Sequence, residues 1–388
     1  MLSLQKHIII CTQQFDNYWS GVGTYGTNLA RGLVRTGWKV TVISPGEYSN
    51  ENDEINFISI EPSKWDFTHG GWFSLALIFS NKLKNIDADL IHFIDARESY
   101  FYKGEIPAVG TLHDYYFANH SWNPFTYKTN YVDWIKRWMY YSFVTLTERR
   151  AFRCLKFLIS NSNATKEIIS NNYNISNEKI RTIYLGIDLD MNPLDEVIEI
   201  QRRENPILLF VGGNIQRKGL STVLKSLPKL IKSYPNLQLY VIGKNQNIER
   251  IKKRSDLMGL TECVKYFGWV PPQEMKKYYR RSTVFVMPSL MEGFGLVFLE
   301  AMAQGLPVIG GKTGGTVELI KNNKNGILVE PDNEKELSQA ILSLLNEVEL
   351  RNNIIQNGYK TVKIYHSQKM VDDTIKLYNT ILEMGSGN

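Results

Sequence analysis

The stretch that says most about the fold is Met287-Pro288-Ser289-Leu290-Met291-Glu292-Gly293-Phe294-Gly295-Leu296-Val297-Phe298-Leu299-Glu300-Ala301-Met302. The apolar residues up to Met287 predict a buried strand, a glycine-bearing loop follows, and a helix begins near Gly295. A strand, a loop and a helix in this order form the repeating unit of parallel α/β sheets. The N–H groups at the start of such a helix suit phosphate or sugar hydroxyl groups.

The same alternation of short apolar runs and longer amphipathic segments extends over most of the chain. The predicted strands are 7–11, 39–43, 56–60, 89–94, 107–112, 157–160, 207–211, 237–242, 263–267, 283–287, 307–310 and 327–329. Helical patterns between them include 24–36, which Gly37 closes, and 132–153. We therefore predict an α/β fold with two doubly wound parallel sheets in tandem.

The pattern lapses between the two sets of strands. Glycine, proline and charged residues gather after Leu185, which predicts a linker over 187–206 between a first domain, 1–186, and a second domain, 207–368. In doubly wound sheets, ligands collect at the carboxyl ends of the strands. A ligand site is therefore expected in the cleft between the domains.

Composition narrows the class of protein. The chain has 388 residues, of which 43% are hydrophobic and 22% charged, and a net charge of +6. This charge fits phosphate-bearing ligands and is too diffuse to predict nucleic-acid binding. The chain has no apolar run long enough to span a bilayer, and 7–11 is too short for a signal-peptide core, so we expect a cytoplasmic protein.

Two acidic residues flank the start of the helix near Gly295. Glu292 lies in the loop, and Glu300 lies inside the helix about one and a half turns later. Two carboxylates at this spacing can reach opposite ends of one elongated ligand. The alternative is a surface glutamate followed by a helix-capping one.

A second strand–loop–helix unit, 210–220, carries the cations Arg217 and Lys218 where its helix begins. Two cations and the helix dipole together suit a diphosphate. A solvated basic pair at a helix start remains the alternative.

These motifs resemble the GT-B-fold retaining glycosyltransferases of family 4, also called group 1, whose hallmark is Glu-x7-Glu. Glu292 and Glu300 fit that spacing, and the flanking Pro-Ser-x-x-Glu-Gly-Phe-Gly and Glu-Ala-Met-Ala-x-Gly-x-Pro-Val match as well. The resemblance implies two Rossmann-like domains, with the stretch from about 369 to 388 crossing back onto the first. It implies that the first glutamate contacts the donor sugar, the second binds the ribose, and Lys218 holds the donor phosphates. Relatives often carry Val-Gly-Arg where this chain has Gly213, and Arg217 could supply the missing guanidinium.

The resemblance extends to further donor-binding residues. It implies contacts from the loop at Gly21, Val22 and Gly23, from the strand end at Gly268 and Val270, and from the residues around Glu292, namely Gly293, Phe294, Gly295, Leu296 and Val297. It also places a histidine near the reacting centre, and His113 follows the predicted strand 107–112.

Two motifs match well-known patterns but lack the structural context that those patterns require. Residues 21–26 fit G-x-G-x-x-G, but a long loop separates them from strand 7–11, and strand 39–43 lacks a following acid, so an oxidoreductase is not predicted. The pairs 87–89 and 188–190 match Asp-x-Asp but do not follow strand ends. We therefore expect no metal and no other cofactor, with cations and helix dipoles neutralising the diphosphate.

Residues 115–156 combine aromatic and basic side chains. They could lie on an anionic membrane at its inner face and receive a lipid-linked acceptor, or form a helix with aromatic residues in the core and bases in water.

The sequence thus predicts a retaining transferase that moves a sugar from a UDP- or GDP-sugar to an acceptor hydroxyl of a glycan or lipid, with His113, Glu292, Arg217 and Lys218 at the reacting centre. Two alternatives are a nucleotide-sugar epimerase of the same architecture and a catalytically inactive sugar-nucleotide-binding subunit.

Overall fold

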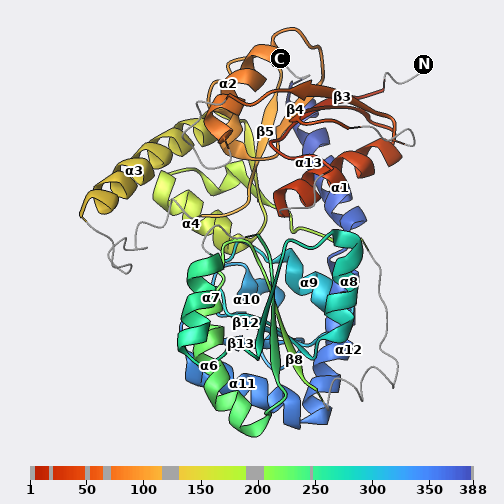
Figure 1. Ribbon diagram of the computed structural model, residues 1–388. Helices are drawn as coiled ribbons and strands as arrows, with labels where there is room; N and C mark the ends of the chain where they lie inside the picture. The colour runs from red at the N-terminus through yellow and green to blue at the C-terminus, as the bar shows by residue number, and fades with distance from the viewer. Residues whose placement is uncertain are drawn as a thin grey trace. The chain divides into compact units, whose positions relative to one another are not determined.

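A computed structural model describes residues 5–16, 21–48, 53–63, 71–115, 131–188, 205–244 and 248–385. The chain forms two compact units, the first made of Met1–Gly186 with Ser367–Asn388 and the second of Ile187–His366 (Figure 1). Each unit is built on one parallel sheet. The predicted α/β class with two parallel sheets is therefore confirmed.

The first unit has a seven-stranded sheet in the order β3-β2-β1-β4-β5-β6-β7. The interior strand β1 is buried from Ile8 to Cys11, as the continuous apolar run of a parallel strand with both faces covered predicts. The elements of this unit are β1 (His7–Cys11), α1 (Gly21–Arg35), β2 (Lys39–Pro45), β3 (Ile55–Ile60), α2 (Trp72–Leu83), β4 (Leu90–Phe93), η2 (Ala96–Ser99), β5 (Ala108–Leu112), α3 (Tyr131–Cys154), β6 (Phe157–Ser160), α4 (Asn163–Tyr173), η4 (Asn177–Lys179), β7 (Ile180–Thr182) and α13 (Ser367–Gly385).

Helix α13 comes from the far end of the sequence and packs on α1 in the first unit (Figure 1). The two helices approach closely because α1 carries Gly32 at the contact. A Cβ atom added to Gly32 would lie 2.3 Å from a methyl carbon of Val371. The buried face of α13 also holds Tyr378.

The second unit has a six-stranded sheet in the order β10-β9-β8-β11-β12-β13. Helices α6, α7 and α11 cover one face, and α8, α9 and α12 cover the other (Figure 1). Its elements are β8 (Ile207–Val211), α6 (Leu220–Ser233), β9 (Gln238–Ile242), α7 (Ile248–Leu257), β10 (Val264–Gly268), α8 (Pro272–Arg281), β11 (Val284–Met287), α9 (Leu296–Ala303), β12 (Val308–Gly311), α10 (Thr316–Leu319), β13 (Ile327–Val329), α11 (Glu334–Asn346) and α12 (Val348–Ile364).

The structure differs from the sequence prediction at two places in the first unit. Helix α1 begins at Gly21, so Gly21, Val22 and Gly23 lie in its first turn and not in a loop. Packing overrides the low helix propensity of glycine here, since Gly23 and Gly26 are buried. The edge strand β7 was not predicted, because only Ile180 of its three residues is buried. Most of the predicted linker, 189–204, lies outside the described residues.

Candidate active site

The candidate donor site of the second unit begins where two neighbouring strands end. Strands β8 and β11 pair side by side, so the loops that follow them meet at one edge of the sheet. The turn after β8 leads to Gly219, whose φ of 82° starts α6. The 288–295 loop after β11 leads to Gly295, whose φ of 97° starts α9. Both glycines adopt a left-handed conformation that other residues rarely take.

Lys218 and Glu292 form an ion pair across these two loops. The Lys218 ammonium donates a short hydrogen bond to Glu292 Oε2. Their side chains are only 14% and 8% exposed, so water screens the pair little. Ser289 Oγ also donates to Glu292 Oε2, at 3.4 Å. In the sequence, Lys218 and Glu292 belong to two separate motifs. The strand order of the sheet brings them together.

Backbone contacts hold the 288–295 loop in place. Leu290 N donates to the carbonyl oxygen of Arg217 at 2.8 Å, and Gly315 N donates to the carbonyl oxygen of Glu292 at 3.0 Å. A Cβ atom on Gly315 would lie 2.0 Å from the carbonyl oxygen of Gly293. Glycine is therefore required for the close approach that fixes Glu292.

Glu300 lies within α9 beside a tyrosine that the sequence did not single out. Tyr279, on α8, donates its hydroxyl hydrogen to Glu300 Oε2 at 2.7 Å. Burial raises the pKa of Glu300, and the Tyr279 hydrogen bond opposes this rise by favouring the carboxylate. Tyr279 therefore orients the Glu300 carboxylate and favours its ionised form.

The remaining predicted residues of the second unit lie at the end of β10, in the loop after β11, or in the first turn of α9. Gly268 closes β10 with a φ of 67°, and its carbonyl oxygen accepts a hydrogen bond from Gly243 N at 2.7 Å. Val270 follows and is buried. Gly293, Phe294 and Leu296 are buried and Val297 is half-buried.

His113 follows β5 in the first unit, as predicted for a residue at a strand end. A carbonyl oxygen can only accept, so the 2.7 Å contact with Ile94 O places the ring hydrogen on Nε2. Burial lowers the pKa of His113, although Asp95 and the Ile94 contact oppose this shift. The neutral ring therefore keeps a lone pair on Nδ1, and the Tyr25 ring packs edge-on against it at 5.3 Å between centroids.

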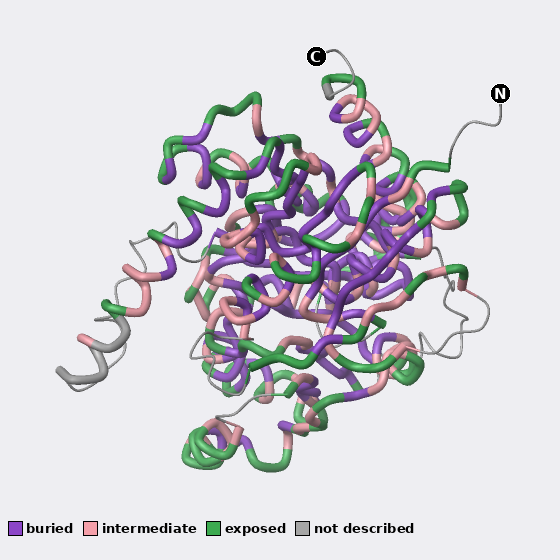
Figure 2. Tube along the Cα trace, turned by 90° about the horizontal axis from the view of Figure 1, so that it is seen from above, coloured by how far each residue is buried: buried purple, intermediate pink, exposed green. Residues whose placement is uncertain are grey.

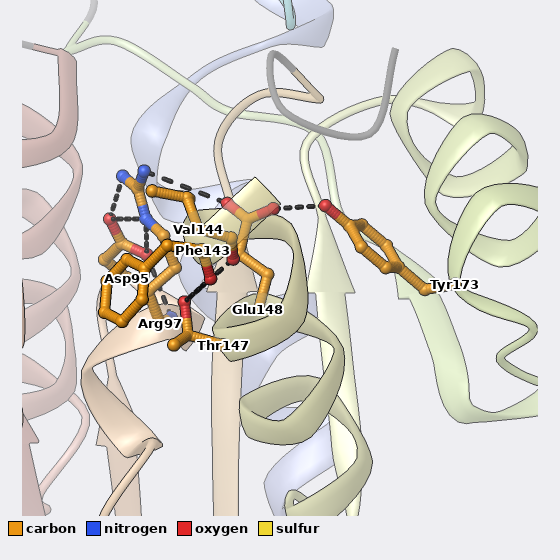
Figure 3. Close-up of polar contacts among 7 residues, drawn as sticks. All are labelled: Asp95, Arg97, Phe143, Val144, Thr147, Glu148 and Tyr173. Carbon is orange, nitrogen blue, oxygen red and sulfur yellow. Dashed lines mark hydrogen bonds and ion pairs between the residues drawn. The ribbon is translucent and has the colours of Figure 1, made fainter. Parts of the chain in front are cut away.

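An ionic network around Arg97, shown in Figure 3, was missed by the sequence analysis. Its charges at Asp95 and Arg97 act on His113. Arg97 Nε donates to both carboxylate oxygens of Asp95, at 2.9 and 3.0 Å, and Arg97 Nη1 lies 3.9 Å from Glu148 Oε1. Tyr173 donates a short hydrogen bond to Glu148. Burial raises the pKa of Glu148 to about 8. The only sequence signal was that Asp95 and Arg97 follow the strand predicted over 89–94.

The Asp-x-Asp pair at 87–89 has a structural role. His7 N donates to Asp89 Oδ2 at 2.7 Å at the amino end of the sheet, away from the strand ends that carry His113. Asp190 of the second pair lies outside the described residues. Across the described ranges, the His, Cys, Asp and Glu side chains form no group of three that could hold a metal ion. No helix in the described part of the chain is long and apolar enough to cross a bilayer.

Comparison with known proteins gives matches over both units. The family model for glycosyltransferase family 4 matches residues 19–191, and the model for glycosyl transferases group 1 matches residues 195–361. An uncharacterized glycosyltransferase of Methanocaldococcus jannaschii is 27% identical over 94% of this chain and 95% of its own. A capsular polysaccharide biosynthesis glycosyltransferase of Staphylococcus aureus is 28% identical over 64% and 67%.

A solved structure has the same fold. The Anabaena protein HepE, in complex with UDP and glucose, superimposes with a TM-score of 0.72 over 98% of this chain and 99% of its own, at 18% identity. With two parallel sheets of this order and both halves matched by adjoining family models, the chain belongs to the GT-B glycosyltransferases of family 4 and group 1.

Proposed function

We propose that this protein transfers a sugar from a UDP- or GDP-sugar to an acceptor hydroxyl with retention of anomeric configuration. The observation that carries the proposal is the buried Lys218–Glu292 pair at the ends of adjacent strands, with Glu300 held by Tyr279 on the helix that follows. A role in cell-surface glycan, glycolipid or polysaccharide synthesis is supported by the S. aureus relative named for capsular polysaccharide biosynthesis. Use of UDP is supported by the HepE complex.

When the donor binds, its diphosphate would replace Glu292 as the ion-pair partner of Lys218. In the free protein, each charge of this buried pair compensates the other, because an unpaired buried charge is costly. A diphosphate between the starts of α6 and α9 would draw the ammonium to itself, together with Arg217. Glu292 would then accept a hydrogen bond from the donor sugar. Glu300 would accept from the ribose hydroxyls, with Gly268 and Val270 beside the base.

The chemistry would depend on positioning and electrostatics. Lys218 and Arg217 stabilise the departing diphosphate, and the acceptor hydroxyl attacks from the face that the diphosphate leaves, passing its proton to a phosphate oxygen. His113, with its lone pair on Nδ1, accepts a hydrogen bond from a sugar hydroxyl. Gly21, Val22 and Gly23, in the first turn of α1, would contact the donor phosphate and border the acceptor. We propose that Lys218 and Arg217 take the place of a divalent metal ion. Full turnover in the presence of EDTA would support this.

The acceptor would be a glycan or a lipid-linked sugar, received at an anionic membrane surface. This part of the proposal is supported by α3, on which Trp138, Met139, Leu146 and Arg149 are exposed. Figure 2 marks the exposed stretches of the described chain in green. Apolar and cationic side chains exposed on one helix suit the interface of a bilayer with anionic lipids.

The test is a thermal-shift screen of nucleotide sugars followed by turnover with the best donor. Glu300→Ala should weaken donor binding, whereas His113→Ala should spare binding and reduce turnover, with the exposed Glu349→Ala, on α12, as control. Normal donor affinity in Glu300→Ala would remove the ribose assignment, and full turnover in His113→Ala would remove the role of the histidine. Nucleoside diphosphate released without acceptor-dependent sugar transfer would contradict the transferase proposal.

A further inference from the structure

Four buried side chains link the C-terminal helix to the histidine of the first unit. Tyr378, on α13, contacts His92 Nδ1 through its hydroxyl at 2.5 Å. His92 Nε2 contacts Thr111 Oγ1 at 2.7 Å, and Thr111 Oγ1 contacts the Tyr25 hydroxyl at 3.2 Å. We call these four residues the relay. All of them are at most 2% exposed, so water does not compete for their hydrogen bonds.

The relay ends on His113. Strand β5 directs Val109 and Thr111 to one face of the sheet, because side chains alternate along a strand, and His113 follows directly after its end. The Tyr25 ring, carried by α1, lies edge-on to both His92 and His113, with centroid distances of 6.2 and 5.3 Å. The hydroxyl of Tyr25 is fixed by Thr111, so its ring cannot tilt without breaking the relay.

The bonds of the relay support one another. Burial lowers the pKa of His92 to about 3, so the ring is neutral and has one donor and one acceptor nitrogen. Thr111 Oγ1 bonds both His92 and Tyr25, and a hydroxyl can donate one hydrogen while it accepts others. Each bond of the relay shares a ring or an oxygen atom with the next, so removing one end weakens the others.

We propose that Tyr378 is a positioning residue for catalysis, holding the Tyr25 ring against His113 through His92 and Thr111. The inference rests on the proposed role of His113. It assigns a function in the reaction to α13, whose residues follow the second unit in the sequence but pack in the first. Tyr378 touches no reacting group and acts only through the relay.

The test is Tyr378→Phe, which keeps the ring that packs on Trp38 and removes only the hydroxyl. Loss of one buried hydrogen bond corresponds to about a fivefold change. We expect kcat to fall about fivefold while the donor Kd stays unchanged. The matched control is Thr374→Val, which removes a buried hydroxyl of the same helix that bonds only within that helix, to Met370 O at 2.7 Å. This control should keep full kcat.

A double-mutant comparison separates positioning from general damage. In the His113→Ala background, Tyr378→Phe should change the residual kcat by less than twofold, because the residue on which it acts is gone. An equal loss in both backgrounds would overturn the inference and leave the proposed function standing. Full activity of His113→Ala alone would instead refute the role of His113. If Tyr378→Phe does not fold, Tyr25→Phe tests the relay from its other end with the same expected pattern.

Discussion

Replacing Tyr279 by Phe tests how the site prepares Glu300 for the donor. The substitution keeps the buried ring and removes the hydroxyl that donates to Glu300 Oε2 at 2.7 Å. Tyr279 is 3% exposed, so water cannot easily replace the lost donor. The carboxylate then loses both its orientation and a partner that favours its ionised form.

The size of the effect follows from the type of hydrogen bond. A bond to a charged group contributes about 1.5–3 kcal/mol. If the lower end of this range is lost from donor binding, the Kd of the nucleoside diphosphate rises about tenfold. Because burial already raises the pKa of Glu300, losing Tyr279 raises it further, and the carboxylate form is lost at a higher pH. The binding defect should therefore shrink as the pH rises.

Isothermal titration with the preferred nucleoside diphosphate, at two pH values, measures this effect. Tyr278→Phe is the matched control, since Tyr278 is the preceding residue of α8 and its ring packs on Phe267. We expect wild-type affinity in the control. Wild-type affinity in Tyr279→Phe, alongside weakened binding in Glu300→Ala, would refute the orienting role of the tyrosine.

Three further predictions concern other parts of the chain. Glu148 has a pKa of about 8 in the folded protein, against an ordinary value of 4.5. Between these two pH values the folded state binds more protons than the unfolded state. The free energy of unfolding therefore falls as the pH rises, by up to about 1.4 kcal/mol per pH unit. Glu148→Gln should flatten this slope in urea unfolding at pH 6, 7 and 8, and an unchanged slope would contradict the buried-acid explanation. Gly315→Ala should destabilise the fold by about 1–3 kcal/mol through overlap with Gly293 O, whereas Gly358→Ala, whose added Cβ comes no closer than 3.3 Å to Met302, should unfold like the wild type in a thermal melt. Arg149→Glu changes the charge by two units, and at about 1 kcal/mol per unit the affinity for phosphatidylserine vesicles, measured by co-sedimentation, should fall roughly thirtyfold. An equal loss of affinity in the charge-matched Arg254→Glu, on α7, would argue against α3 as the contact.

The sheets could be predicted from sequence because their strands are short apolar runs with sharp ends. Strands 7–11, 157–160, 207–211 and 327–329 have the predicted bounds. The start of α1 could not be predicted, since glycines normally interrupt helices and only the packing against the sheet explains Gly23 and Gly26. The three-residue edge strand β7 carries too little apolar pattern to be recognised.

The candidate site was less accessible to sequence reasoning. Lys218 and Glu292 are 74 residues apart, and their contact follows from the pairing of β8 with β11, which no local pattern contains. Tyr279 lies on an ordinary amphipathic helix and gains meaning only from Glu300. Asp95 and Arg97 resemble solvated charges until α3 brings Glu148 over them.

The close contact of α1 with α13 has a consequence for how the chain folds during synthesis. The ribosome releases α1 early, but the helix that covers it at Gly32, and supplies Tyr378 to His92, emerges more than 300 residues later. Until then, one side of the nascent first unit keeps apolar surface and a histidine without its final partner. That side of the first unit would therefore stay accessible to chaperones for the longest time, even after the second unit has folded.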